Sequence, residues 1–203
     1  MKPRVDRSPR RRLDADTRRV AILDAARRLF AASGYGKVSV DDVAEAAEAS
    51  PALVFRYFGS KAGLYTAVLS RLLAEVEERQ RASDAALPPN VSARDRVRAS
   101  LEVYLDHVAE QPDAWAATTL GAEEPREATQ ARRAAQRERT AQLRSWLGSG
   151  EWARHAYAVD GYAGFVDHAC ALWAERGCPG DEREAVIAAC LGCLEGALGD
   201  WAA

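Results

Sequence analysis

Residues with the chemistry to bind nucleic acid lie close together in the first third of the chain. The guanidinium of Arg56 can pair bidentately with guanine or bind a phosphate, and the phenol of Tyr57 can hydrogen-bond a phosphate. Lys61 lies at the start of an expected helix, where its ammonium and the free backbone N–H groups can meet one phosphate. Ser39 can do the same at an earlier helix. These side chains predict a DNA-binding surface.

Cysteines in the rest of the chain indicate a second chemistry, metal binding or thiol reactivity. Cys190 and Cys193 lie three residues apart on an expected helix, so their sulfurs can share a face. Zinc usually takes four nitrogen or sulfur ligands, which Cys170 or His168 could help to supply. The segment is an apolar helix rather than a knuckle loop, which favours buried thiols, and we assign no metal ligand. A metal- or thiol-responsive regulator that uses the C-terminal cysteines, Cys178 included, remains the alternative.

Catalytic chemistry is not indicated. The three histidines, His107, His155 and His168, stand in no recognisable catalytic motif. The sequence has no phosphate-binding Gly-rich loop and no nucleophile elbow. We therefore expect neither enzymatic activity nor a cofactor.

Composition and charge favour an all-α protein with two different parts. Ala, Leu, Arg and Glu dominate, and no long alternating β-branched run occurs. Residues 1–65 carry 13 Lys/Arg against 8 Asp/Glu, a net +5, whereas residues 66–203 carry 15 against 22, a net −7. A basic head on an acidic body suits a DNA reader with a separate sensor. No apolar run approaches the ~20 residues that cross a membrane, and residues 1–20 lack the apolar region of a secretory signal, so we expect a cytoplasmic protein.

Local signals between residues 39 and 61 predict three helices in quick succession. Ser39 with Asp42 forms a capping box for the first, and Ser50 followed by Pro51 begins the second. Ser60 caps the third. The apolar residues between these caps recur at helical spacing. Two short helices joined by a tight turn match a helix-turn-helix, whose second helix enters the DNA major groove.

The ordered series of motif residues over residues 18–68 resembles the DNA-binding domain of the TetR family of transcriptional regulators. This series consists of Leu29-Phe30, Gly34, Ser39, Ser50, Tyr57-Phe58, Lys61 and Leu64. The resemblance implies an all-α fold, with an N-terminal three-helix DNA-binding domain and a C-terminal helical ligand-binding and dimerisation domain. It implies a homodimeric repressor that binds a palindromic operator and is released by a small molecule. The residues expected to face DNA are Ser39, Ser50, Pro51, Ala52, Arg56, Tyr57 and Lys61.

Three residues depart from the pattern of the family. Glu48 stands where the turn usually has Gly. A positive φ angle at this position is sterically unfavourable for Glu. Leu53 and Phe55 stand where Thr and Tyr are common, which removes two hydroxyls that could contact phosphate. We interpret Phe55, together with Phe58, as a core residue.

The chain divides by these patterns into a flexible basic arm over residues 1–16, a DNA-binding domain over 17–65 and a helical body over 66–203. Helices are expected at about 17–33, from 61 to about 83, and at about 92–110, 126–147, 152–176 and 181–201. In the resembling family the last two helices form a four-helix bundle with their copies in a second subunit. Ordinary packing within one chain is the alternative.

Aromatic and polar residues of the body could line a ligand pocket. Most such pockets are apolar with a few polar anchors, so we expect an apolar or aromatic ligand. Packing in an ordinary core is the alternative for each residue. The candidates are Tyr104, His107, Trp115, Thr118, Thr119, Trp146, Tyr157, Phe165 and His168.

Overall fold

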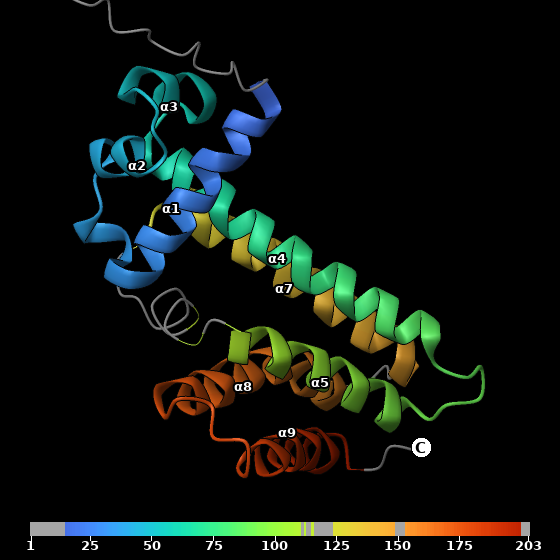
Figure 1. Ribbon diagram of the computed structural model, residues 1–203. Coiled ribbons are helices and arrows are strands. Elements are labelled where there is room, and N and C mark those ends of the chain that lie inside the picture. The colour runs from blue at the N-terminus through green and yellow to red at the C-terminus, as the bar shows by residue number, and fades with distance from the viewer. Residues whose placement is uncertain (1–14, 111, 113–114, 116–123, 149–152, 200–203) are drawn as a thin grey trace, which may run out of the picture.

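The computed structural model describes residues 15–110, 112, 115, 124–148 and 153–199, and these residues contain α-helices and no strand (Figure 1). The all-α fold expected from the sequence is confirmed. The helices are α1 (Ala15–Lys37), α2 (Val40–Ala46), α3 (Pro51–Phe58), α4 (Lys61–Ala86), α5 (Ala93–Glu110), α7 (Arg126–Leu147), α8 (Ala153–Glu175) and α9 (Arg183–Leu198).

All three predicted caps are present at the helix starts. The backbone N–H of Asp42 donates to Ser39 Oγ at 3.1 Å, and the N–H of Ser39 donates to an Asp42 carboxylate oxygen at 2.7 Å. Ser50 Oγ accepts from the N–H of Leu53, and Ser60 Oγ accepts from the N–H of Gly63. Each cap satisfies a backbone donor that the first turn of a helix leaves free.

Two backbone positions shape the turns of this region. Gly34, with φ 74° and ψ 166°, interrupts the helical conformation near the end of α1, where the sequence predicted a stop. Glu48, between α2 and α3, has φ 49°. The turn therefore keeps a residue in the left-handed backbone conformation although this residue is not glycine. The Cβ atom of Glu48 makes that conformation sterically unfavourable.

The buried apolar residues form two cores. We call α1, α2, α3 and the first part of α4 the head; its core includes Ile22, Phe30, Val43, Val54 and Leu64. We call α5, α7, α8, α9 and the second part of α4 the body; its core includes Leu101, Leu105, Val159, Ile187 and Leu194. The head core also receives Ala128, from the start of α7.

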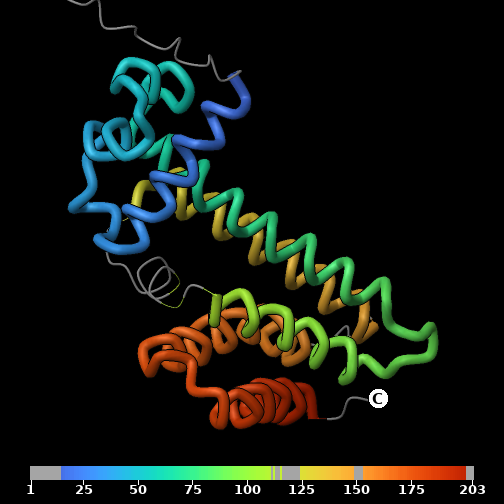
Figure 2. The backbone as a smooth tube through the Cα atoms, viewed as in Figure 1, coloured from blue at the N-terminus to red at the C-terminus, as the bar shows by residue number. Residues whose placement is uncertain are grey.

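Helix α4 joins the two parts. It leaves the head and runs beside α7, while α5, α8 and α9 lie below in the view of Figures 1 and 2. Tyr65, Val68 and Leu69 belong to the head core, and Val76 belongs to the body core. The predicted boundary after residue 65 thus falls inside one continuous helix. No helix in the described ranges is both long and apolar enough to cross a bilayer.

Candidate DNA-binding surface and ligand cavity

Helix α3 has one buried side and one exposed side. Val54 is 1% exposed in the head core, and Leu53, Tyr57 and Phe58 pack partly against that core. Phe55, in contrast, is 49% exposed, so its interpretation as a core residue is wrong. The physical reason is the helical period, which places residue 55 on the face of residues 52 and 56 rather than on that of residue 54.

Most of the residues expected to face DNA lie exposed along the first two turns of α3. Ser50, Pro51, Ala52 and Arg56 are exposed, whereas Tyr57 is half-buried. No acidic residue occurs in the first turn of α3. This face could therefore approach a polyanion without repulsion from its own helix.

Lys61 and Ser39 have partners of their own at the edges of this surface. Lys61 Nζ donates to the carbonyl oxygen of Gly36 at 3.4 Å and lies 4.4 Å from the ring centre of Tyr35. The Lys61 side chain is therefore directed toward the end of α1. The hydroxyl of Ser39 accepts from the N–H of Asp42. A phosphate contact by either residue would be made in addition to these local bonds.

Arg19, a cation on α1 that lies beside α3, was not predicted from the sequence to face DNA. Its guanidinium carbon lies 5.3 Å from the ring centre of Phe58, and the residue is exposed. Only the tertiary contact between Arg19 and Phe58 reveals this position, since the two residues are far apart in the sequence.

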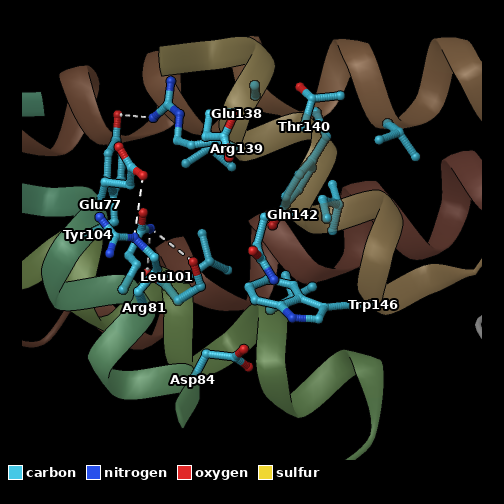
Figure 3. A pocket seen from close by; sticks show the side chains of 18 of the residues that line it. Glu77, Arg81, Asp84, Leu101, Tyr104, Glu138, Arg139, Thr140, Gln142 and Trp146 are labelled. Atoms are coloured by element: carbon cyan, nitrogen blue, oxygen red, sulfur yellow. Dashed lines mark hydrogen bonds and ion pairs between the residues drawn. The ribbon is translucent and has the colours of Figure 1, made fainter. Parts of the chain in front are cut away.

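A cavity of about 330 Å³ opens between α4, α5, α7 and α8 of the body (Figure 3). Its volume falls within the range of small-molecule sites. The apolar part of its wall comes mainly from α5, α7 and α8, and the polar part from α4 and α7. The apolar wall includes Val97, Leu101, Leu143, Trp146, Val159, Tyr162 and Val166, and the polar wall includes Glu77, Gln80, Arg81, Asp84, Glu138 and Arg139.

Both guanidinium groups in the cavity wall are already paired with carboxylates of the protein. Arg81 lies 3.3 Å from Glu77 and 2.8 Å from Glu78. Arg139 lies 3.1 Å from Asp167. An anionic ligand would have to compete with these carboxylates for its counter-charge.

A polar partition separates this cavity from a second one of about 280 Å³, because Tyr104 and Arg139 line both. Tyr104 donates to Asp167 through its hydroxyl and accepts from Arg139 at 2.8 Å. Burial raises the pKa of Tyr104 well above its ordinary value, so the phenol stays neutral and remains a donor. The network therefore forms part of the wall of both cavities.

The predicted ligand-binding residues fall into several places. Tyr104 and Trp146 line the larger cavity, and Trp115 and His168 line the second. His107 is buried beside Trp115 and lines neither. Thr118 and Thr119 lie outside the described residues.

Two of these candidates, Tyr157 and Phe165, lie on the outward side of α8. They are 81% and 38% exposed, whereas Val159, Tyr162 and Val166 of the same helix face the cavity. The structure therefore does not place them in the cavity, because they occupy the opposite helical face. Gln80 and Arg139 line the cavity but were not predicted from the sequence, since their residue types do not distinguish a cavity wall from a surface.

The cysteines offer no support for the metal- or thiol-responsive alternative. Cys170 and Cys190 are buried, and burial raises the pKa of both thiols, that of Cys190 to about 12. Such thiols stay protonated at neutral pH and react poorly. Within the part of the chain that the structure describes, no three His, Cys, Asp or Glu side chains are placed to hold a metal ion.

The fold and these surfaces define a helix-turn-helix DNA-binding protein with a cavity-bearing helical body. A family profile described as "Bacterial regulatory proteins, tetR family" matches residues 22–68. Residues 22–68 thus match the DNA-binding domain of the TetR family, which confirms the resemblance found in the sequence over this part of the chain.

Similarities to known proteins, in sequence and in fold, are consistent with this assignment. The chain is 34% identical over 97 residues to the HTH-type transcriptional activator FasR of Mycolicibacterium smegmatis, a match that covers 48% of this chain and 43% of that protein. A TetR-family regulator from Streptomyces coelicolor superimposes with a TM-score of 0.71 at 22% identity, over 93% and 91% of the two chains. FadR from Bacillus subtilis in complex with stearoyl-CoA superimposes with a TM-score of 0.67 at 17% identity, over 88% of this chain and 96% of that chain. The curated relative is thus matched over less than half its length, and the two structures show likeness of fold.

Proposed function

We propose that the chain is a one-component transcriptional regulator whose affinity for DNA depends on a small molecule in the body. The observation that carries this proposal is the course of α4. Leu64, Val68 and Leu69 at its start pack in the head core, and Gln80, Asp84 and Ala85 near its end line the cavity. A ligand that shifts the second part of α4 therefore displaces the head.

The ligand that fits the larger cavity is mostly apolar and without negative charge. The wall is largely aliphatic and aromatic, and its two guanidinium groups are neutralised by Glu77, Glu78 and Asp167. Transfer of an anion into such a site costs free energy that no unpaired cation of the described wall offsets. In this respect the proposed ligand differs from stearoyl-CoA, to which the structurally similar FadR is bound.

We propose a homodimer that uses the outward faces of α8 and α9. Tyr157, Phe165 and Leu172 are exposed apolar residues along one helix, α8. An apolar row of this kind is typical of a protein interface. Two heads held by such a dimer would bind half-sites of a palindrome ~34–36 Å apart, or a multiple of that distance.

The proposed default is repression: the free protein occupies its operator and the ligand releases it. The relative FasR is named as an activator, so the sign of regulation needs its own test. A reporter gene placed behind the selected operator should be silent with the protein and active when the ligand is added. Higher expression with the protein than without it would reverse the sign and leave DNA binding intact.

Selection of DNA sequences by the purified full chain tests the proposal. We expect a palindrome to be enriched and its affinity to fall steeply as salt rises, because phosphate contacts release counterions. Arg56→Ala should weaken binding about 5–150-fold, the loss of ~1–3 kcal/mol expected for a base-contacting arginine. Arg133→Ala, at an exposed position on α7, is the matched control and should bind as wild type does. Absence of any enriched sequence would contradict the proposal.

A further inference from the structure

Helix α3 presents a large aromatic side chain to solvent. Phe55 is 49% exposed, next to Val54, which is 1% exposed. A single exposed apolar residue is ordinary on a protein surface and means little by itself. The position of Phe55 gives it meaning, because α3 is the second helix of the helix-turn-helix and would enter the major groove.

The exposed face of α3 combines apolar groups with one cation. Ala52 lies three residues before Phe55, and Arg56 follows it; both are exposed. The phenyl ring of Phe55 has no hydrogen-bond donor or acceptor, so it can bind neither a phosphate oxygen nor a polar base edge. Its only favourable partner in the groove is an apolar one.

The major groove offers one bulky apolar substituent on a base edge, the C5-methyl of thymine. Adenine, guanine and cytosine carry no methyl group there, and their edges are recognised mainly through donors and acceptors. We propose that Phe55 contacts a thymine methyl in each operator half-site and thereby sets the base preference at that position, beside the base or phosphate that Arg56 binds. This inference rests on the proposed DNA-binding function and adds a specificity residue to it.

The test removes methyl groups from the DNA one at a time. Once selection with wild type has given the palindrome, each thymine of a half-site is replaced by deoxyuridine, which lacks the methyl and keeps the O4 acceptor. We expect one replacement to weaken binding about fourfold, the equivalent of ~0.8 kcal/mol for a buried methyl-sized group. The other replacements should change affinity less than twofold.

Substitutions at Phe55 then assign that methyl effect to its side chain. Phe55→Ala should bind thymine and deoxyuridine equally at the sensitive position. Phe55→Gln, which retains a long side chain, should also lose the methyl effect, and its selected sequence should shift toward adenine, which Gln can bind bidentately. Val20→Ala is the control: Val20 is 43% exposed on α1 of the head, and this variant should keep the wild-type fourfold effect.

Each outcome has a definite meaning. A palindrome without any methyl-sensitive thymine would overturn the inference while leaving the proposed function standing. A fourfold effect that persists in both Phe55→Ala and Phe55→Gln would also overturn it, because another residue would then make the contact. Failure to select any palindrome would overturn the proposed function and this inference together. Thermal melting of both variants, expected to match wild type because residue 55 is exposed, shows that a loss of discrimination is not a loss of folding.

Discussion

The head and the body differ in how far apart in sequence their functional residues lie. The expected DNA-facing residues fall between Ser39 and Lys61, on short helices with side-chain caps at their starts. The cavity of the body takes its wall from four helices, from Glu77 to Val166. A surface built from adjacent residues leaves a local sequence pattern, whereas a cavity built from distant helices depends on how those helices pack.

The largest effects are expected from substitutions in the two cores, which test whether the head and the body unfold separately. Leu64→Ala in the head and Leu105→Ala in the body each remove a fully buried side chain and should each cost about 2–5 kcal/mol of unfolding free energy. Every tryptophan lies after residue 66, so tryptophan fluorescence reports the body while far-UV circular dichroism reports all helices.

Urea unfolding followed by both signals makes the comparison. Leu64→Ala should lower the urea concentration at which the dichroism signal begins to change, and should lower the fluorescence midpoint less. Leu105→Ala should produce the larger decrease in the urea midpoint of the fluorescence transition. Coincident shifts of both signals in both variants would mean that α4 makes head and body one cooperative unit.

A smaller effect is expected from the polar partition of the body. Asp167→Asn removes the carboxylate that pairs with Arg139, a pair whose side chains are 24% and 28% exposed. The loss should be about 2 kcal/mol, in the range for a hydrogen bond to a charged group. The control Asp160→Asn breaks a pair with Arg144 in which the side chains are 60% and 45% exposed, and it should cost less than about 0.5 kcal/mol. Equal losses in chemical denaturation would argue against a structural role for the partition.

The body should also lose stability in mild acid through His107. Burial, followed by the charge of Arg79, lowers the pKa of this imidazole from 6.5. The unfolded chain therefore takes up the proton first as pH falls below about 6.5, and stability declines until the folded-state pKa is reached. His107→Gln should lose less melting temperature between pH 7.5 and pH 5.5 than wild type. An unchanged loss would show that other groups cause the acid sensitivity; His168→Gln, at an exposed position, is the control.

The smallest expected effect concerns the turn of the head. Glu48→Gly relieves a left-handed backbone at φ 49° but adds flexibility to the unfolded chain, so stability should rise by no more than about 1 kcal/mol. Glu45→Gly, inside α2, should instead destabilise by roughly 0.5–1 kcal/mol. The melting temperatures of the two variants should therefore move in opposite directions. A destabilised Glu48→Gly variant would mean that the Glu48 side chain stabilises the turn by more than its backbone strain costs.

The sequence allowed more of the head to be predicted than of the body. Ser39, Ser50 and Ser60 each cap a helix as expected, because capping depends on residues three positions apart. Phe55 was misassigned, since α3 is only two turns long and its apolar residues occur on both faces. In α8 the aromatic residues Tyr157 and Tyr162 differ only in orientation, and the packing partners that decide it are distant in sequence.

The coupling of the cavity to the head through α4 can be measured directly. The affinity of the full chain for its selected operator should be measured with 1-decanol as an uncharged apolar probe, and with decanoate as the anionic control. We expect 1-decanol to raise the melting temperature more than decanoate does, and to weaken operator binding about 5–150-fold, a coupling of ~1–3 kcal/mol. An unchanged operator affinity, at a 1-decanol concentration that raises the melting temperature, would contradict this coupling and show that the cavity and the head act independently.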